Sequence, residues 1–199
     1  MLKKNNYPGI PLADVMTVSE IPRPPHWFER PQVAVRDFLS RQAGQSVLKA
    51  YRRNDIDFSA IPAKSRAQLG VDIGRWRLLP KHYRLLQSFA EKHGVSNPHV
   101  ILQGLLMYHS FRDRPPQEVR KLTEAVLSRI SVSPLPESKK AIANREELSR
   151  SYAYFADLHA KAHRDAEFNG VLQEIFNRSK TGSAHPESLR SFAQSLERH

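Results

Sequence analysis

Apolar residues recur every three or four positions along most of the chain, a spacing that places them on one face of an α-helix. This pattern predicts long helices over 31–53, 80–93, 97–111, 116–129, 137–164 and 166–178. Shorter helices are expected at 63–69, ended by Gly70, and at 187–199. The predicted fold class is therefore mainly α-helical.

One short segment follows a different period. In IGRWRLLPKHY, residues 73–83, the apolar side chains of Trp76 and Leu78 alternate with Arg75 and Arg77. A period of two is that of a β-strand, whose successive side chains point to opposite faces. We therefore expect one short strand directly before the helix that begins at residue 80.

Breaks rich in proline and polar residues divide the chain into five expected parts. These are a proline-rich extended arm at 1–30, an N-terminal helical segment at 31–70, a central unit at 71–111, a C-terminal helical region at 116–180 and a tail helix at 181–199. Trp27 and Phe28 are expected to anchor the arm onto the body of the protein, because they follow its prolines directly.

Charge narrows the class of partner. The 199 residues carry a formal net charge of +11, and the pI is about 10.1. Such a balance favours a polyanionic partner, nucleic acid before a membrane surface. Residues 61–114 hold nine Lys or Arg against three Asp or Glu, a net +6, so the excess charge is concentrated around the strand-like segment. The alternative is a solvated basic surface that binds nothing specific.

Several kinds of chemistry are not indicated. The absence of cysteine excludes disulfides, thiol catalysis and cysteine-ligated zinc. No apolar run approaches the roughly 20 residues of a membrane span, and the N-terminus lacks the apolar core of a signal peptide, so we expect a cytoplasmic protein. No phosphate-binding glycine loop or nucleophile motif is present, so we expect neither an enzyme nor a cofactor.

Two helices joined by a tight turn are predicted after the strand. Gly94 can end the first helix, because glycine readily takes the left-handed conformation found just past a helix C-terminus. Ser96 stands where the N-cap of the second helix belongs. A helix-turn-helix has the same spacing of Ala90 and Gly94, but its second helix reads DNA with polar side chains. The apolar sequence ILQGLLMYH at 101–109 disfavours that alternative.

The sequence FAEKHGVSNPHVILQGLLMYH, with the alternating segment before it, resembles the ribbon-helix-helix (Arc/MetJ-like) family of DNA-binding proteins over residues 73–109. The resemblance implies an intertwined dimer, in which two strands pair antiparallel and enter the major groove as a ribbon. An internal pseudo-dimer is the alternative, because SRISVSPLP at 128–136 looks like a second strand and FNGVLQEIF at 168–176 like a second core helix. The long spacer at 137–164 favours the homodimer.

The strand register that buries apolar side chains assigns the roles of individual residues. In this register we expect Ile73, Arg75 and Arg77 to face the DNA groove. The family resemblance implies that the turn at Ser96 and Asn97 contacts DNA phosphates, with Lys81 and Arg84 as candidate helpers. Arginine suits the groove because it can form a bidentate contact with guanine. The dimer core is expected to consist of Trp76, Leu78, Leu86, Phe89, Ile101 and Leu105.

The function expected from this resemblance is sequence-specific binding of double-stranded DNA, by a transcriptional repressor or by an accessory factor in plasmid or mobile-element transfer. The helical flanks on either side of 73–109 are expected to contact a protein partner. The alternative is a non-enzymatic helical adaptor that uses the strand only to dimerise, without DNA affinity beyond weak non-specific binding.

One histidine pair has metal-ligand spacing. His159 and His163 lie four residues apart on a predicted helix. The glutamate of the usual zinc-protease motif is absent, and no third ligand is evident. We therefore favour a solvated or ring-stacked pair over a metal site.

Overall fold

Except at residues 70–76, the helices form close to the positions that the apolar spacing predicts. The computed structural model describes residues 30–131, 139–180 and 185–198. Within these ranges the helices are α2 (Arg30–Arg52), α3 (Ala63–Trp76), α4 (Pro80–Glu91), α5 (Pro98–Phe111), α6 (Pro116–Ser131), α7 (Lys139–Arg164), α8 (Ala166–Lys180) and α9 (Pro186–Glu197). Trp27 and Phe28 of the expected arm lie outside the described residues.

Proline and capping residues set several helix ends. Helices α4, α5, α6 and α9 begin at a proline, whose fixed φ suits the first helical position. Gly94 ends α4 as predicted, with φ +68°, and the Val95 N–H donates to the Ala90 carbonyl at 3.0 Å. The N-cap of α5 is Asn97 rather than the predicted Ser96, because the Asn97 side chain accepts from the His99 N–H at 3.0 Å.

The expected strand at residue 73 is absent, and with it the ribbon-helix-helix unit. The described residues contain helices and no strand. Ile73 and Trp76 lie in the last turns of α3, which continues through Gly70 instead of ending there. Arg77 closes α3 in the left-handed conformation, φ +45°, and Leu78 donates its N–H to the Ile73 carbonyl at 3.2 Å. The apparent alternation is therefore the end of one helix followed by a cap.

The prediction of paired strands is also wrong, because the described residues contain no strand. Without a strand, neither a dimeric ribbon nor an internal pseudo-dimer can form as expected. Residues 128–131 of the second strand-like segment belong to α6, and residues 132–136 lie outside the described ranges. The segment 168–176 is part of α8.

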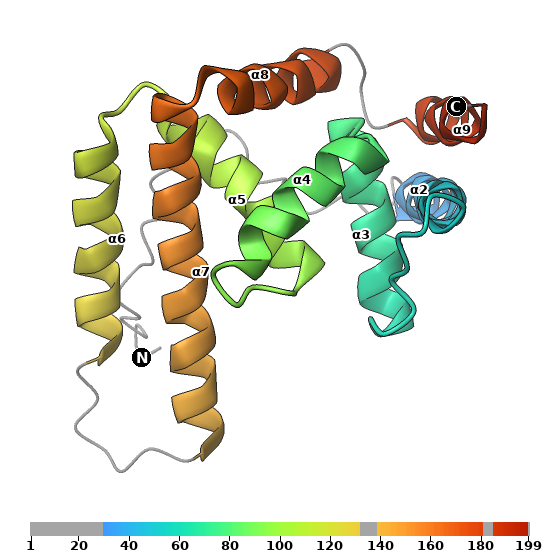
Figure 1. Cartoon of the computed structure of the whole chain (residues 1–199). Coiled ribbons are helices and arrows are strands. Elements are labelled where there is room, and N and C mark those ends of the chain that lie inside the picture. The colour runs from blue at the N-terminus through green and yellow to red at the C-terminus, as the bar shows by residue number, and fades with distance from the viewer. Residues whose placement is uncertain (1–29, 132–138, 181–184, 199) are drawn as a thin grey trace.

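Two groups of helices lie on either side of α4 and α5 (Figure 1). Helices α2 and α9 lie side by side at the right of the view and pack on α3. Helices α6 and α7 run antiparallel at the left, and α7 contacts both α5 and α8. Helix α8 crosses the top and reaches α3, so it links the two groups.

The six residues assigned to a dimer core lie in the core of a single chain. A buried apolar cluster runs from α2 to α9 and includes side chains of α3, α4, α5, α7 and α8. Four of the six are fully buried in it, and the other two pack against it half-buried: Leu78, Leu86, Ile101 and Leu105, then Trp76 and Phe89. The four fully buried side chains are not available for contact with a second copy.

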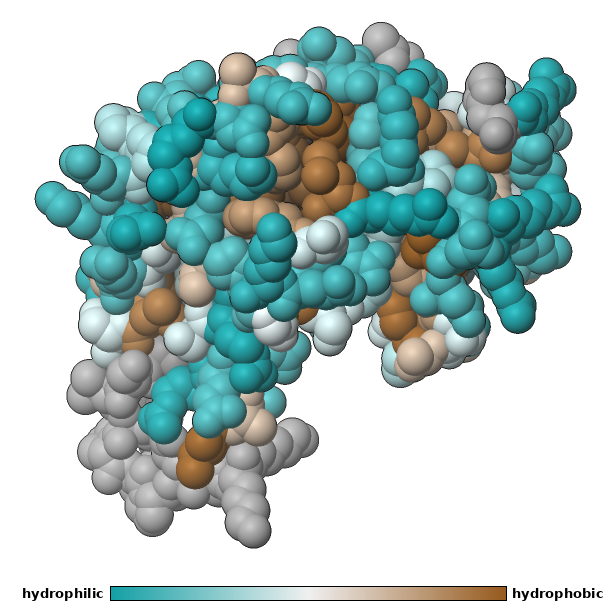
Figure 2. All heavy atoms as spheres, viewed as in Figure 1, coloured by the Kyte–Doolittle hydropathy of each residue, from teal (hydrophilic) through white to brown (hydrophobic). Residues whose placement is uncertain are grey.

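The surface is mainly hydrophilic in the view of Figure 2, where apolar side chains show chiefly in a hollow near the upper centre. Three apolar side chains on α2 are nevertheless exposed, with 58% of Val35, 60% of Phe38 and 36% of Leu39 open to solvent. None of the helices in the described ranges combines the length and the apolar character needed to cross a membrane.

Candidate nucleic-acid interface

The residues assigned to the DNA groove do not share one surface. Ile73 is fully buried in the core, so it cannot contact DNA in this fold. Arg77 is half-buried at the end of α3, and its carbonyl accepts from Arg178 Nε of α8 at 3.3 Å. Arg75 is exposed on α3. Of these three residues, Arg75 alone keeps a position suited to the predicted role.

The residues assigned to phosphates are also dispersed. Arg84 donates to the Asn54 carbonyl and lies 3.9 Å from Asp55, so it braces the loop after α2. Lys81 is exposed in the first turn of α4.

Ser96 and Asn97 lie at the turn between α4 and α5, where they line a cavity of about 120 Å³ with Glu147 and Arg150. The side-chain oxygen of Asn97 is already used as the helix cap. The Glu147 carboxylate in the same cavity repels a phosphate. This turn is therefore poorly suited to clamp DNA.

Arg75 lies instead in a pocket with two arginines of α2. Arg36, Arg41 and Arg75 line a cavity of about 470 Å³, which is also bordered by Ser40 and Gln68. None of the three arginines forms an ion pair with another described residue. We call this cavity the arginine pocket. Arginine presents a planar set of donors that matches phosphate oxygens in pairs, so three such groups form a strong anion site.

The surroundings of the arginine pocket add to its positive potential. Helix α9 begins at its edge with His185 and Pro186, and no side chain caps this N-terminus. The partial positive charge of a helix N-terminus favours an anion. The Asp37 carboxylate also lines the pocket and opposes part of this charge, which leaves three arginines against one aspartate. Nearby, burial raises the pKa of Asp72, which accepts a hydrogen bond from Gln68 at 3.0 Å.

The solvent-facing side of α2 is basic, and it shares Arg41 with the arginine pocket. Exposed side chains at spacings of three and four share this face: Phe38, Arg41, Gln45, Lys49 and Arg52. No aspartate or glutamate occurs in α2 after residue 37. The opposite side of the helix, with Gly44 and Val47, packs on α3. One long helix is therefore held by its inner face and presents cations outward.

The sequence pattern did not single out Arg36 and Arg41. That pattern predicts the helix and its apolar positions and assigns no role to its basic residues. The regular spacing of Arg41, Lys49 and Arg52 was the available signal. The sequence does not show that Arg75 lies close to Arg36 and Arg41, because this proximity depends on how α3 crosses α2.

The histidine pair is ring-stacked. The rings of His159 and His163 lie with centroids 4.5 Å apart, and their Nε2 atoms contact the carbonyls of Phe111 and Arg112 at 2.8 and 3.2 Å. No group of three metal-ligating side chains occurs in the part of the chain that the structure describes. The pair ties the end of α5 to α7.

The free energy of unfolding is expected to fall as the pH is lowered from about 7 to about 5.5. Burial lowers the pKa of His159 and of His82 in the folded protein below the usual value of about 6.5. The unfolded chain then binds more protons than the folded chain, so stability present above pH 6.5 is lost as the pH falls. Urea unfolding at several pH values measures this slope, and His159→Gln should reduce it. An unchanged slope in that variant would exclude His159 as its source.

No family model, curated protein or solved structure matches the chain. The geometry of the chain itself therefore carries the proposals that follow.

Proposed function

We propose that the protein binds double-stranded DNA, with α2 in the major groove and a backbone phosphate in the arginine pocket. The observation that carries this proposal is the convergence of Arg36, Arg41 and Arg75 on one cavity beside the basic face of α2. The net charge of +11 supports it, because phosphate contacts dominate the affinity of proteins for DNA.

The shape of α2 suits the groove. Its 23 residues extend about 34 Å at 1.5 Å per residue. The major groove is about 12 Å wide and admits one α-helix. Gln45 and Arg52 are side chains of the types that read adenine and guanine edges, and Phe38 can contact a thymine methyl group. Base contacts of this kind would make the binding sequence-specific. The roles in repression and DNA transfer followed from the ribbon-helix-helix resemblance and are not part of this proposal.

The triple substitution Arg36→Ala, Arg41→Ala and Arg75→Ala is expected to weaken binding to duplex DNA about a hundredfold at 0.1 M salt. It should also flatten the dependence of log affinity on log salt by about one unit, because the one phosphate contact in the arginine pocket is lost. Fluorescence anisotropy with a labelled duplex at several salt concentrations measures both effects. All three side chains are exposed, so the variant should fold normally.

A charge-matched control separates this site from net charge. Lys92 is the C-cap of α4, and Lys121 and Arg129 lie on α6; all three are exposed and away from α2. Replacing these three with alanine removes the same charge and should reduce affinity much less. Equal losses in the two triple variants would contradict a localised site.

A second candidate function is protein binding without DNA recognition. It is favoured by Val35 and Leu39, which border a groove of about 570 Å³ between α2 and α9. This alternative predicts only weak, non-specific DNA binding that the arginine-pocket substitutions do not change more than the control substitutions do. The anisotropy measurement therefore distinguishes the two candidates.

A further inference from the structure

A second charged cavity lies on the other side of the molecule, where the end of α4 meets α6 and α7. Its volume is about 450 Å³, which is within the range of small-molecule sites. It is lined by Phe89, His93, Arg120, Asp157, Lys161, Arg164 and Asp165. Nothing in the proposed DNA interface uses these residues, so the inference drawn from them stands apart from that proposal.

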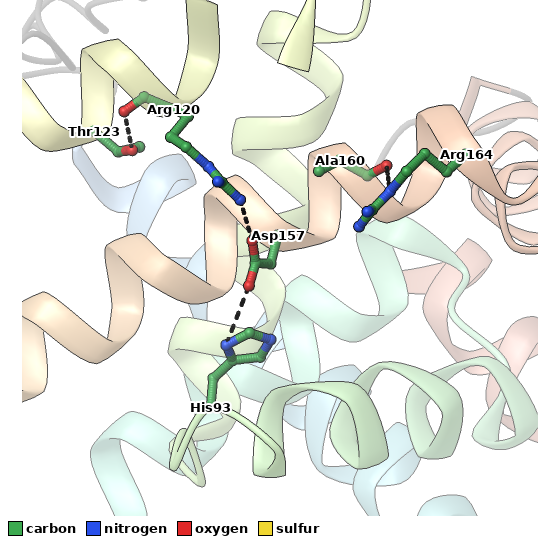
Figure 3. Close-up of polar contacts among 6 residues, drawn as sticks. All are labelled: His93, Arg120, Thr123, Asp157, Ala160 and Arg164. Carbon is green, nitrogen blue, oxygen red and sulfur yellow. Dashed lines mark hydrogen bonds and ion pairs between the residues drawn. The ribbon is translucent and has the colours of Figure 1, made fainter. Parts of the chain in front are cut away.

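Asp157, one of the lining residues, lies between Arg120 and His93, and the Arg120 guanidinium balances its charge (Figure 3). One of its carboxylate oxygens accepts from Arg120 Nη2 at 3.1 Å, and the other lies 3.8 Å from His93 Nδ1. Asp157 therefore holds a cation from α6 and an imidazole from the end of α4 at one point.

Asp165 is neutralised in the same way. One carboxylate oxygen accepts from Lys161 Nζ at 2.6 Å, and the other accepts from the Phe168 N–H at 3.0 Å. The bond from Lys161, with that N–H, lowers the pKa of Asp165, so the carboxylate stays ionised. Both carboxylates in the cavity thus have cationic partners.

Arg164 carries the positive charge that the two carboxylates of the cavity do not balance. Three cations and two carboxylates line the cavity, a net +1 with His93 neutral. Arg164 Nε donates to the Ala160 carbonyl at 3.2 Å, which fixes the plane of the guanidinium (Figure 3). It has no carboxylate partner among the described residues. Because Asp157, Lys161 and Arg164 are spaced by four and three, they share one face of α7.

One wall of the cavity is aromatic. The ring of Phe89 lies against that of His93, with centroids 5.1 Å apart, and packs on the inner rings of Tyr154 and Phe168. The packing holds the Phe89 ring in place opposite the charged side chains of α7. A ligand that fills the cavity must therefore offer both an anionic group and a flat apolar group.

We propose that this cavity binds a small phosphate monoester that carries an aromatic ring, with the phosphate on Arg164 and Arg120 and the ring against Phe89. The guanidinium groups supply paired donors for the phosphate oxygens. Binding joins α4, α6 and α7 through one ligand. The phosphate of a nucleic acid has the same chemistry, and the experiment separates the two sources.

Isothermal titration calorimetry with phenyl phosphate tests the proposal on the full-length protein. Phenyl phosphate is expected to bind with a Kd of about 1 mM or lower, and inorganic phosphate and benzyl alcohol more weakly, because each supplies only one of the two groups. Arg164→Gln should raise the Kd for phenyl phosphate at least about tenfold. Arg129→Gln, an exposed arginine elsewhere on α6, should leave its affinity unchanged.

Asp157→Asn is expected to increase the affinity for phenyl phosphate, whereas Arg164→Gln decreases it. It removes a carboxylate beside the expected phosphate position and frees Arg120, so phenyl phosphate should bind more tightly. A general loss of structure would weaken binding instead, and circular dichroism checks the fold of each variant.

Three outcomes would overturn the proposal. These are no heat with phenyl phosphate up to 10-fold above the expected Kd of about 1 mM, equal affinity in wild type and Arg164→Gln, or no preference over benzyl alcohol. If the cavity binds a phosphate of nucleic acid instead, phenyl phosphate would not bind, and Arg164→Gln would weaken the binding of duplex DNA measured by fluorescence anisotropy. That result would reject the small-ligand site and would place a DNA contact at this cavity, outside the interface proposed on α2.

Discussion

Gly70→Ala is expected to lower the free energy of unfolding by about 3 kcal/mol, at the upper end of the usual effect of overpacking. A Cβ at this position would lie 2.2 Å from the carbonyl oxygen of Gly44 and 2.7 Å from its carbonyl carbon. The contact is with backbone, so no side-chain rotation relieves it and α2 must move away from α3. This loss exceeds the gain of about 1 kcal/mol that alanine brings to a helix interior. Urea denaturation measures the change.

Gly170→Ala is the matched control. Gly170 is exposed in α8, and a Cβ there would meet nothing within 4 Å. This substitution should therefore stabilise the protein by about 0.5–1 kcal/mol, through helix propensity alone. If Gly70→Ala were equally harmless, the close crossing of α2 and α3 would be wrong.

Tyr154→Ala is expected to lower the free energy of unfolding by about 4 kcal/mol, as large-to-small changes of buried aromatic residues do. The Tyr154 side chain is fully buried, and its ring lies over the face of α5 that Gly104 leaves open. A Cβ at Gly104 would be 2.5 Å from Tyr154 Cε1. Removing the ring leaves a void between α5 and α7 that these packed helices cannot close.

Tyr154→Phe separates the ring from the hydroxyl. The hydroxyl donates to the Ile101 carbonyl at 3.2 Å, and losing this bond should cost about 1 kcal/mol. Thermal and urea unfolding of the two variants give the comparison. If the two substitutions cost the same, the hydroxyl rather than the packing would hold α7 to α5.

Apolar spacing and helix-ending residues were sufficient to predict a helix whose position depends on its own sequence. The spacing of apolar residues located the helices, and Gly94 ended α4 because the left-handed conformation favours glycine. The same rule is wrong at Gly70, where it predicts the end of a helix that in fact continues to Trp76. Its lack of a side chain serves a close helix crossing instead, which only the partner helix reveals.

The strand prediction failed because two patterns overlap in a short window. Ile73 and Trp76 continue the helical spacing from Leu69, while Trp76 and Leu78 also fit a period of two. The helix is favoured because Leu69 and Ile73 are both buried in the core. Left-handed Arg77 then ends the helix, a position where glycine is common and arginine gives no local signal.

By itself the sequence determined the helical class, most helix positions and a strong positive charge, because these follow from residue type and spacing. Only the tertiary structure decided which cations act together. Arg36 and Arg75 are 39 positions apart in the chain, and they line one pocket because α3 crosses α2 at two glycines. It likewise buried Ile73 and left Arg164 facing a cavity. Such proximity arises from the packing of whole helices, which no local pattern specifies.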